Sequence, residues 1–284
     1  MGGTEMRIAV LSGKGGAGKT LVSVNLAAAA GRAVYVDCDV EEPNGHLFLK
    51  PEDVETTEIT VQLPRFDGDK CTGCRKCVDF CRFNALAFIQ DKPLLFPEVC
   101  HSCGGCAVLC PAQAVSEAPY TVGVVERGHS RDLTVLTGRM NPGNASGSPI
   151  IKALYRQLAE EKELTIMDCP PGSACLVMES IQDADYGVLV AEPTIFGAHN
   201  LAMVYELMQV FHKPFGVVLN KCTGGADPSE AFCQAHGITI LGRIPFEERL
   251  GRLNGNGEVA AWADEAYAQL FGELLQTILK EAAR

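Results

Sequence analysis

The fold follows from one stretch near the start of the 284-residue chain, Arg7-Ile8-Ala9-Val10-Leu11-Ser12-Gly13-Lys14-Gly15-Gly16-Ala17-Gly18-Lys19-Thr20. Its apolar first part predicts a short buried strand, and its second part fits the pattern G-x-x-x-x-G-K-[ST]. In that pattern, backbone N–H groups surround phosphate at a helix N-terminus, the lysine reaches the β- and γ-phosphates, and the threonine hydroxyl coordinates Mg²⁺. The stretch therefore predicts nucleotide-binding residues at Gly13, Lys14, Gly15, Gly16, Ala17, Gly18, Lys19 and Thr20, with Thr20 as a magnesium ligand.

Strand and helix signals alternate on the carboxyl side of this stretch. An alanine-rich helix is expected from Thr20 to Ala30, ending at Gly31, and the strand Ala33–Asp37 follows. A further helix is expected at 149–159, and further parallel strands are expected at 122–125, 133–136, 164–167, 186–191, 217–220 and 238–241. This alternation predicts an α/β fold, a P-loop nucleotide-binding domain whose mainly parallel sheet is covered by helices on both faces.

The alternation is interrupted from about residue 64 to residue 119, where short turns, prolines and paired cysteines replace the long apolar periods. Two runs lie there, Cys71-x-x-Cys74-x-x-Cys77-x-x-x-Cys81 and Cys100-x-x-Cys103-x-x-Cys106-x-x-x-Cys110-Pro111. Their spacing is typical of bacterial ferredoxins that hold two [4Fe-4S] clusters. We therefore expect an inserted ferredoxin-like α+β domain at 64–119, with the nucleotide-binding domain divided between 1–63 and 120–284.

The cysteines also predict how the ligands are shared. In two-cluster ferredoxins the fourth cysteine of each run binds the other cluster. Cluster one is therefore expected to use Cys71, Cys74, Cys77 and Cys110, and cluster two Cys81, Cys100, Cys103 and Cys106. Two zinc ions with four thiolates each are the alternative. Arg82 stands where proline usually follows the first run, which alters the turn without removing a ligand.

Two acidic residues follow apolar strands, at the edge where α/β sheets bind ligands. Asp39 comes shortly after the strand 33–37, and Asp168 comes directly after residues 164–167. Because magnesium prefers oxygen ligands, we expect Thr20, Asp39 and Asp168 to surround the Mg²⁺ ion, with Asp37 in a supporting role. Acidic strand ends without a function are the alternative.

Lys14 adds a second lysine to the loop, which reads Lys14-Gly15-Gly16-Ala17-Gly18-Lys19-Thr20. This form resembles the deviant loop of the MinD, ParA and Mrp ATPases and of the nitrogenase iron protein, in particular the branch of that superfamily with an inserted two-[4Fe-4S] ferredoxin domain. The resemblance implies that Lys14 crosses a dimer interface to the partner's nucleotide, in a homodimer that sandwiches ATP. A solvated Lys14 that only offsets nearby acidic groups is the alternative.

The same resemblance implies roles around the γ-phosphate. Asp39 would position the attacking water, with Lys14 and Lys19 as the other catalytic residues. Pro170-Pro171-Gly172 would form a second switch, in which the Gly172 N–H senses the γ-phosphate. Hydrolysis of ATP to ADP and phosphate is then expected to be slow until a partner binds.

The choice of base can be argued from Asn220-Lys221-Cys222-Thr223. An aspartate two residues after Lys221 would accept hydrogen bonds from guanine, and Thr223 stands there instead. An asparagine amide can pair with the N6/N7 edge of adenine. We therefore expect ATP and ADP as ligands, with Asn220, Lys221 and Pro245 near the base.

Composition limits the partners. A formal net charge of -11 argues against nucleic acid, whose phosphates bind basic surfaces. No run of about 18 apolar residues is present to insert into a membrane, and Met1–Met6 lacks a signal-peptide core and a myristoylation site. Thirteen cysteines without an export signal favour metal ligation in a reducing compartment, so a cytoplasmic protein is expected.

Three further features remain, and the first two leave alternatives open. The Gly- and Pro-rich run 137–149 is either a contact loop or a plain surface excursion. Cys175 lies seven residues after Asp168, where the nitrogenase iron protein has a bridging cysteine, and it is either part of an interfacial metal site or a buried small residue. Residues 258–284 carry an apolar stripe at helical spacing, through Trp262, Leu270, Leu274 and Ile278.

Together these features predict an ATPase whose Mg-ATP-dependent dimerisation and switching control electron transfer by two [4Fe-4S] clusters to a redox partner protein or a metal centre under assembly. The alternative is a positioning or cluster-delivery ATPase whose clusters are structural or cargo.

Overall fold

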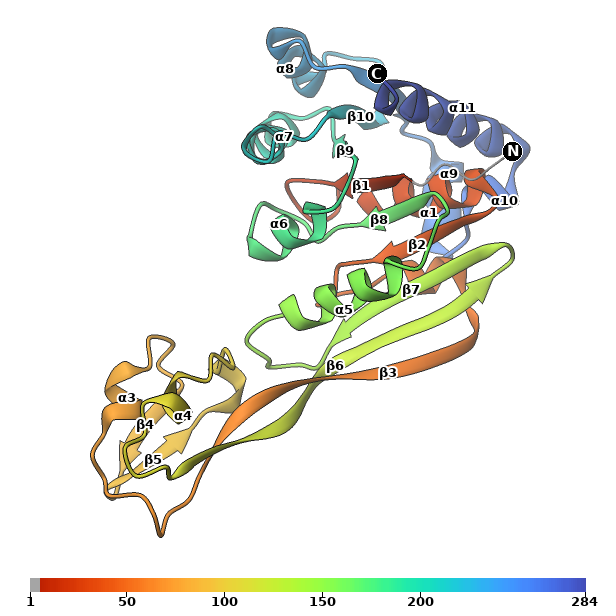
Figure 1. The fold of residues 1–284 in the computed structure, drawn as a ribbon. Coiled ribbons are helices and arrows are strands. Elements are labelled where there is room, and N and C mark those ends of the chain that lie inside the picture. Colours follow the sequence, from red (N-terminus) through yellow and green to blue (C-terminus); the bar gives the residue numbers. More distant parts are fainter. Residues whose placement is uncertain (1–5) are drawn as a thin grey trace.

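The structure of the chain is a computed structural model that describes residues 6–284; Met1–Glu5, part of the segment in which we expect no targeting signal, lies outside the described residues. A large sheet lies between two layers of helices, and a small unit projects from it at the end of a long ribbon (Figure 1). Within the described residues the large sheet has nine strands. In spatial order they are β11 (Ile240–Pro245), β10 (Phe215–Cys222), β9 (Tyr186–Ala191), β1 (Arg7–Leu11), β8 (Thr165–Asp168), β2 (Ala33–Asp37), β7 (Leu133–Met140), β6 (Val115–Ser130) and β3 (Glu52–Phe66).

The strands from β11 to β7 run parallel, and helices cover both of their faces. One face packs against α5 (Ser148–Leu158), α6 (Cys175–Ile181), α7 (Ile195–Val210) and α8 (Pro228–His236). The other packs against α1 (Lys19–Ala30), α2 (Gly45–Leu49), α9 (Glu248–Gly255), α10 (Ala260–Ala263) and α11 (Glu265–Ala282). The predicted fold class is therefore confirmed, because strands buried on both faces require the continuous apolar runs that the sequence contains.

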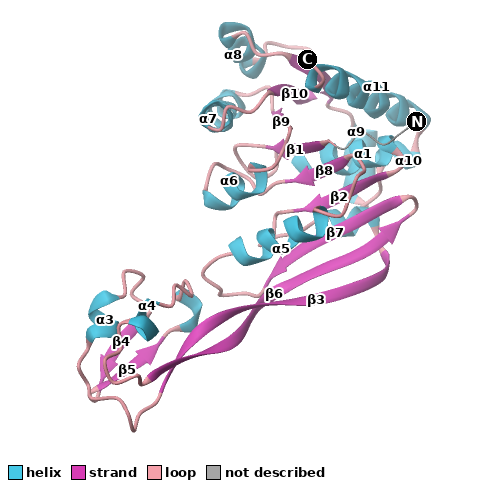
Figure 2. Cartoon of the chain, viewed as in Figure 1, coloured by secondary structure: helices cyan, strands magenta, loops and turns pink. Residues whose placement is uncertain are grey.

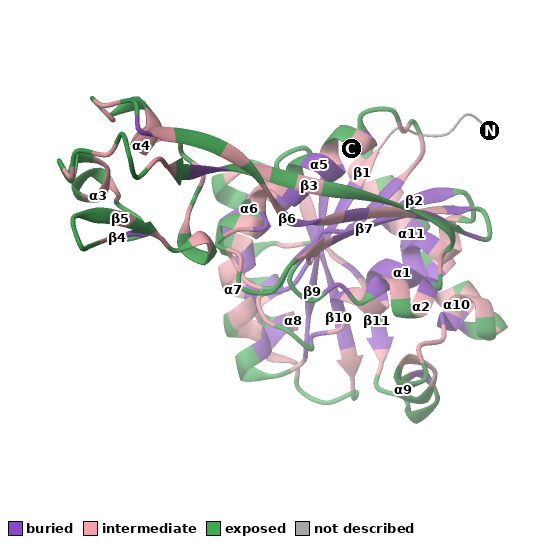
Figure 3. Cartoon of the chain, turned by 90° about the horizontal axis from the view of Figure 1, so that it is seen from below, coloured by how far each residue is buried: buried purple, intermediate pink, exposed green. Residues whose placement is uncertain are grey.

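β3 and β6 form an antiparallel ribbon that begins in the sheet and extends well beyond it. Near the sheet β6 also pairs with β7, again antiparallel, so the prediction that 122–125 belongs to the parallel set is wrong. β3 is the edge strand, and the sequence pattern does not predict it. Most of its side chains are exposed (Figure 3), and Glu, Asp and Thr occupy positions where alternating apolar residues would mark a strand.

The small unit lies between the far ends of the ribbon strands and is built from short elements (Figure 2). They are α3 (Lys76–Phe80), β4 (Leu86–Ile89), β5 (Lys92–Leu95), the 3-10 helix Pro97–Val99 and α4 (Gly105–Val108). The expected segment boundaries, 64 and 119, fall inside the ribbon, where Pro64 pairs with Glu117 and Gln62 with Pro119. Paired strands, rather than two single-chain linkers, thus connect the small unit to the body.

Other sequence predictions change in detail. The 137–149 run is a shorter loop than expected, because β7 continues to Met140 and α5 begins at Ser148. The apolar stripe of 258–284 spans two helices, since Asp264 ends α10 and caps α11 by accepting a hydrogen bond from the Ala266 N–H. Across residues 6–284, no helix combines the length and apolar composition that crossing a membrane demands.

Candidate functional site

The phosphate loop connects β1 to α1 at the carboxyl edge of the parallel strands; residues 13–18 of the predicted nucleotide-binding set lie in the loop, and Lys19 and Thr20 begin α1. Gly16 and Gly18 have φ angles of 82° and 96°, which residues with side chains rarely adopt. A Cβ atom on Gly13 would lie 2.0 Å from the Asn200 carbonyl oxygen. The glycines therefore permit a tight backbone path that leaves N–H groups free for an anion at the start of α1.

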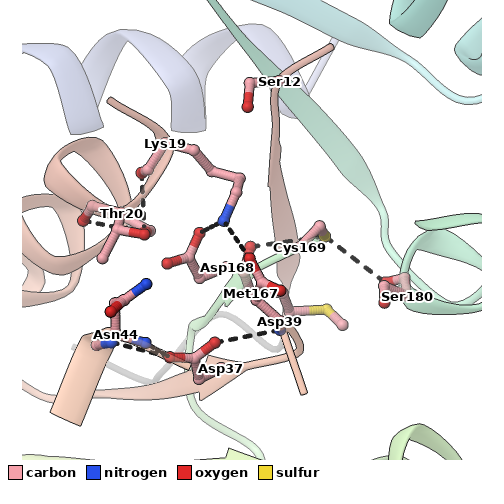
Figure 4. Close-up of polar contacts among 12 residues, drawn as sticks. Ser12, Lys19, Thr20, Asp37, Asp39, Asn44, Met167, Asp168, Cys169 and Ser180 are labelled. Carbon is pink, nitrogen blue, oxygen red and sulfur yellow. Dashed lines mark hydrogen bonds and ion pairs between the residues drawn. The ribbon is translucent and has the colours of Figure 1, made fainter. Parts of the chain in front are cut away.

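Lys19 is buried at the centre of the site, beside the two predicted magnesium carboxylates (Figure 4). Its Nζ donates to Asp168 Oδ1 at 2.7 Å and lies 3.7 Å from Asp39 Oδ2. Burial alone would lower the pKa of Lys19, but the charges of Asp168 and Asp39 outweigh it and raise this pKa. Burial raises the pKa of Asp39 to about 6, although the Lys19 charge opposes that shift. The ammonium group thus pairs with the carboxylates that we expect to face magnesium.

Asp37 orders the turn between β2 and α2. Its carboxylate accepts hydrogen bonds from the backbone N–H groups of Asp39, Asn44 and Gly45, at 3.1, 3.0 and 2.9 Å (Figure 4). Such donors hold a buried carboxylate in one orientation. Asp37 therefore fixes the backbone that presents Asp39 to the site.

Tyr35 is a site residue that the sequence pattern does not reveal. It is fully buried in β2, and its hydroxyl donates to Asp168 Oδ2 at 3.0 Å. The sequence offers one clue to this role: Tyr35 lies two residues before Asp37, so both side chains lie on the same face of the strand. A buried tyrosine hydroxyl needs a polar partner, and Asp168 is that partner here.

Gly172 lies in the turn after β8, with a φ angle of 92°. Its N–H donates to the Ser12 carbonyl oxygen at 2.9 Å, while its neighbour Pro171 lines the nucleotide pocket. A contact between the Gly172 N–H and a γ-phosphate would have to replace the bond to Ser12. The predicted sensing role therefore requires this turn to move.

A pocket of about 520 Å³ opens beside the loop, within the size range of small-molecule sites. The predicted residues that line it are Lys14, Gly15, Gly16, Gly18, Lys19, Thr20, Asp39, Asn220, Lys221 and Pro245. Its apolar wall comes from Leu47 and Phe48 of α2, from Phe246 between β11 and α9, and from Leu250 of α9. No local motif marks Leu47, Phe48 or Leu250, whereas Phe246 belongs to the segment 245–247 that we expect to pack near the base.

Asn220 lines the pocket and also contacts the phosphate loop. It lies within β10, its side chain is buried, and its Nδ2 donates to the Ala17 carbonyl oxygen at 2.8 Å. The amide thus supports the phosphate loop. Lys221 and Pro245 line the pocket, as does Phe246.

Lys14 forms an ion pair within its own chain rather than extending into solvent. Its Nζ lies 2.8 Å from Glu192 Oε2. Lys221 approaches the same carboxylate, with Nζ donating to Glu192 Oε1 at 2.6 Å and to the Gly16 carbonyl oxygen at 2.9 Å. Glu192 follows β9 without any recognisable motif, so the sequence alone does not single it out.

The eight cysteines of the small unit line two cavities. One cavity is lined by Cys71, Cys74, Cys77 and Cys110, and the other by Cys81, Cys100, Cys103 and Cys106 together with Cys77. Within residues 6–284, no three Cys, His, Asp or Glu side chains are close enough to hold a single metal ion. Thiols that surround a cavity rather than a point fit a multinuclear cluster better than one tetrahedral zinc ion.

Cys175 begins α6, and its side chain is exposed. The prediction of a buried small residue is therefore wrong. After the turn that contains Gly172, α6 starts at the surface of the molecule. Cys175 is therefore exposed, although it lies only seven residues after the buried Asp168.

Comparison with known proteins identifies the family. The sequence model of the CobQ/CobB/MinD/ParA nucleotide binding domain matches residues 8–260. An uncharacterized protein of Methanocaldococcus jannaschii is 30% identical over 94% of this chain and 97% of its own length. The iron-sulfur cluster carrier protein of Pyrococcus horikoshii is 22% identical over 98% of this chain and 86% of its own.

Both parts of the fold have relatives. An uncharacterized ferredoxin of Methanocaldococcus jannaschii is 36% identical over 17% of this chain and 69% of its own length, which is consistent with the inserted unit. The solved structure of the cell division ATPase MinD from Pyrococcus furiosus has a TM-score of 0.62, at 19% identity over 98% of this chain and 99% of that one. The chain therefore belongs to the CobQ/CobB/MinD/ParA family of nucleotide-binding domains, with a ferredoxin-like unit inserted into the MinD-like P-loop fold.

Proposed function

We propose that the chain is an ATPase in which Mg-ATP-dependent dimerisation and switching control electron transfer by two [4Fe-4S] clusters to a partner protein or a metal centre under assembly. The observation that carries the proposal is that neighbouring strands join the two sites. β2 leads into the turn that holds Asp37 and Asp39, β7 pairs with β2, and β6 pairs with β7 before it extends into the small unit.

The nucleotide half of the proposal rests on the residues that converge at the pocket. Thr20, Asp39 and Asp168 offer the oxygen atoms that magnesium prefers. When phosphate oxygens replace Asp168 and Asp39 as partners of Lys19, both carboxylates become available to the ion. The fold shared with the cell division ATPase MinD supports ATP as the nucleotide.

The cluster half rests on the two cysteine-lined cavities of the small unit. The first cavity has four thiols, and the second has the four of its expected set together with Cys77, which is enough at each for the four ligands of a [4Fe-4S] cluster. Such a cluster supplies one-electron chemistry when bound. The similarity to a ferredoxin and to an iron-sulfur cluster carrier supports the same cofactor.

Hydrogen bonds provide a route between the halves. Val40 follows Asp39, is fully buried, and accepts a hydrogen bond from the Met140 N–H at 2.8 Å. The next residue, Asn141, donates its N–H to the Val122 carbonyl oxygen of β6 at 2.9 Å. A shift of Asp39 toward bound Mg-ATP is therefore expected to displace strands that continue into the ribbon.

The proposal is tested by electron paramagnetic resonance during stepwise anaerobic reduction, in ADP and in Mg-ATP, with the wild-type chain and the Asp39→Asn variant. We expect both clusters to reduce reversibly, and the variant trapped with ATP to reduce over a different range from the ADP state. The variant should retain ATP without turnover and should copurify with the partner that accelerates hydrolysis by the wild-type chain. Identical reduction in every nucleotide state, or normal turnover by Asp39→Asn, contradicts the proposal.

A cluster-delivery ATPase is the second candidate, and similarity to an iron-sulfur cluster carrier over 98% of this chain favours it. The same experiment separates the candidates. Clusters that never reduce in an accessible range, but move to an apo-acceptor when ATP is added, would assign delivery rather than electron transfer.

A further inference from the structure

Glu192 is a buried carboxylate at the nucleotide site that the proposed chemistry does not use. Only 9% of the residue is exposed, at the point where β9 ends and the chain turns toward α7. Its backbone is held firmly, because its carbonyl oxygen accepts hydrogen bonds from Ser229 Oγ at 2.6 Å and from the Thr194 N–H at 2.8 Å. These bonds anchor the backbone of Glu192 to α8 and to the residue that caps α7.

Two lysines share this carboxylate, one on each oxygen. Lys14 Nζ lies 2.8 Å from Oε2, and Lys221 Nζ lies 2.6 Å from Oε1. Burial alone would raise the pKa of Glu192, but the hydrogen bonds from Lys14 and Lys221 outweigh it and hold this pKa below its usual value. Glu192 is thus an ionised carboxylate with two cationic partners.

The two lysines differ in the number of partners that hold their ammonium groups near Glu192. Lys221 is held twice, since its Nζ also donates to the Gly16 carbonyl oxygen, and its backbone has a φ angle of 62°. Among residues 6–284, the Lys14 ammonium group has Glu192 as its one partner, and since the two lysine side chains are almost equally exposed, at 40% and 41%, the number of partners is what distinguishes them. When Lys14 departs, Lys221 still neutralises the carboxylate, so Lys14 can be released without leaving a buried charge unpaired.

We propose that Glu192 is an intramolecular latch, a positioning residue that keeps Lys14 in its own subunit until a second nucleotide-loaded copy of the chain competes for it. The inference rests on the proposed ATP-dependent dimer, in which Lys14 reaches the partner's phosphates. Because the bond to Glu192 exists in the monomer and is broken when Lys14 crosses, the latch raises the free-energy cost of dimerisation, and only the phosphates of a nucleotide-loaded partner offset that cost. Ile195 and Phe196 begin α7, three and four residues after Glu192, and are 79% and 77% exposed. The surface beside the latch therefore includes large exposed apolar side chains, which are typical of protein contacts.

The latch itself is tested by the amine reactivity of Lys14 without nucleotide, measured by mass spectrometry of the full chain and normalised to exposed Lys152 of α5. In Glu192→Gln, labelling of Lys14 should rise at least about twofold, because a carboxylate-bound ammonium group must leave its partner before it reacts. The matched control is Glu206→Gln, the same change at an exposed position of α7, and it should label like the wild type. An unchanged Lys14 rate in Glu192→Gln overturns the latch.

Its regulatory role is tested by the dimer dissociation constant in saturating Mg-ATP, from analytical ultracentrifugation. Glu192→Gln should dimerise about fivefold more tightly than the wild type and Glu206→Gln. Faster Lys14 labelling without tighter dimerisation overturns the role assigned to the latch. A wild-type chain that remains monomeric in Mg-ATP refutes the proposed dimer instead, and the labelling rates still decide whether Glu192 restrains Lys14.

Discussion

At the scale of single residues, Tyr35 holds a carboxylate that no motif connects to it. Its hydroxyl is bonded to Asp168 Oδ2, while Lys19 pairs with the other oxygen. In Tyr35→Phe, Asp168 Oδ2 loses its donor in a buried position. We expect the free energy of unfolding of the nucleotide-free chain to fall by about 1–2 kcal/mol, and the affinity for Mg-ATP to fall about fivefold.

Chemical denaturation and a magnesium-dependent nucleotide titration measure the two effects. Tyr186→Phe is the matched control, because Tyr186 is also a buried strand tyrosine but lies at the amino end of β9, away from the phosphate site. If Tyr35→Phe binds Mg-ATP as tightly as the wild type, Tyr35 has no part in orienting Asp168.

The pKa of Asp39 gives stability a dependence on pH. Because burial raises this pKa from 3.8 to about 6, the folded chain binds more protons than the unfolded chain between these values. Stability from this group is therefore full below about pH 4 and is lost as pH rises through about 6. The expected loss is roughly 1–2 kcal/mol after solvent screening.

Equilibrium unfolding at pH 5 and pH 7, followed by fluorescence of Trp262, the one tryptophan of the chain, measures this dependence. Burial also raises the pKa of Asp37, to about 8, and this contributes a loss of the same sign. Asp39→Asn should therefore reduce the change between the two pH values without abolishing it, and Mg-ATP should offset the Asp39 part because the ion stabilises the charged carboxylate. A wild-type slope that persists in Asp39→Asn would assign the titration to another group.

At the scale of elements, the turn from β2 into α2 packs against the site through Gly45. A Cβ atom at this position would lie 2.1 Å from the Tyr35 hydroxyl oxygen. Gly45→Ala should therefore destabilise the chain by about 1–3 kcal/mol, and it should weaken Mg-ATP binding by displacing Tyr35 from Asp168.

Gly272→Ala is the matched substitution, because Gly272 lies inside α11 and a Cβ there meets nothing within 4 Å. Alanine should stabilise that helix by up to about 1 kcal/mol. Thermal unfolding of both variants checks the pair. Equal shifts of the same sign would mean that close packing at Gly45 does not govern the turn.

The ribbon of β3 and β6 shows where local prediction of elements fails. Parallel strands in the core were predictable, because both of their faces are apolar. The ribbon lies at and beyond the edge of the sheet, so its stability depends on pairing between residues far apart in the chain, from Phe66 with Val115 to Glu52 with His129, rather than on an apolar pattern. Its length therefore emerges only from the tertiary structure.

At the scale of the whole molecule, the cavities predict which cysteines act together. Cys110 belongs to the second run of cysteines but lines the cavity of the first run. Cys81 belongs to the first run but lines the cavity of the second. Cys110→Ser should lose cluster one and keep cluster two, and Cys81→Ser should do the reverse. Each variant should therefore retain about half of the wild-type iron.

Iron analysis and electron paramagnetic resonance of each variant check this assignment, with Cys222→Ser in the body as the control. Loss of both clusters from each variant would show that the small unit folds only when fully loaded. In that case Cys110→Ala and Cys81→Ala, examined for nucleotide binding, would show whether the body folds independently of it. Loss of cluster two from Cys110→Ser would reverse the ligand sets.

The sequence by itself determined the parallel core, the phosphate loop and the eight thiols, because each depends on residues that lie close together in the chain. Backbone conformation, helix N-termini and short cysteine spacings are local properties, and local patterns encode them. The tertiary structure alone decided that Asn220 supports the loop, that Tyr35 holds Asp168 and that Glu192 restrains Lys14. These partners are contributed by separate strands, so only the packing of the sheet brings them within hydrogen-bonding distance.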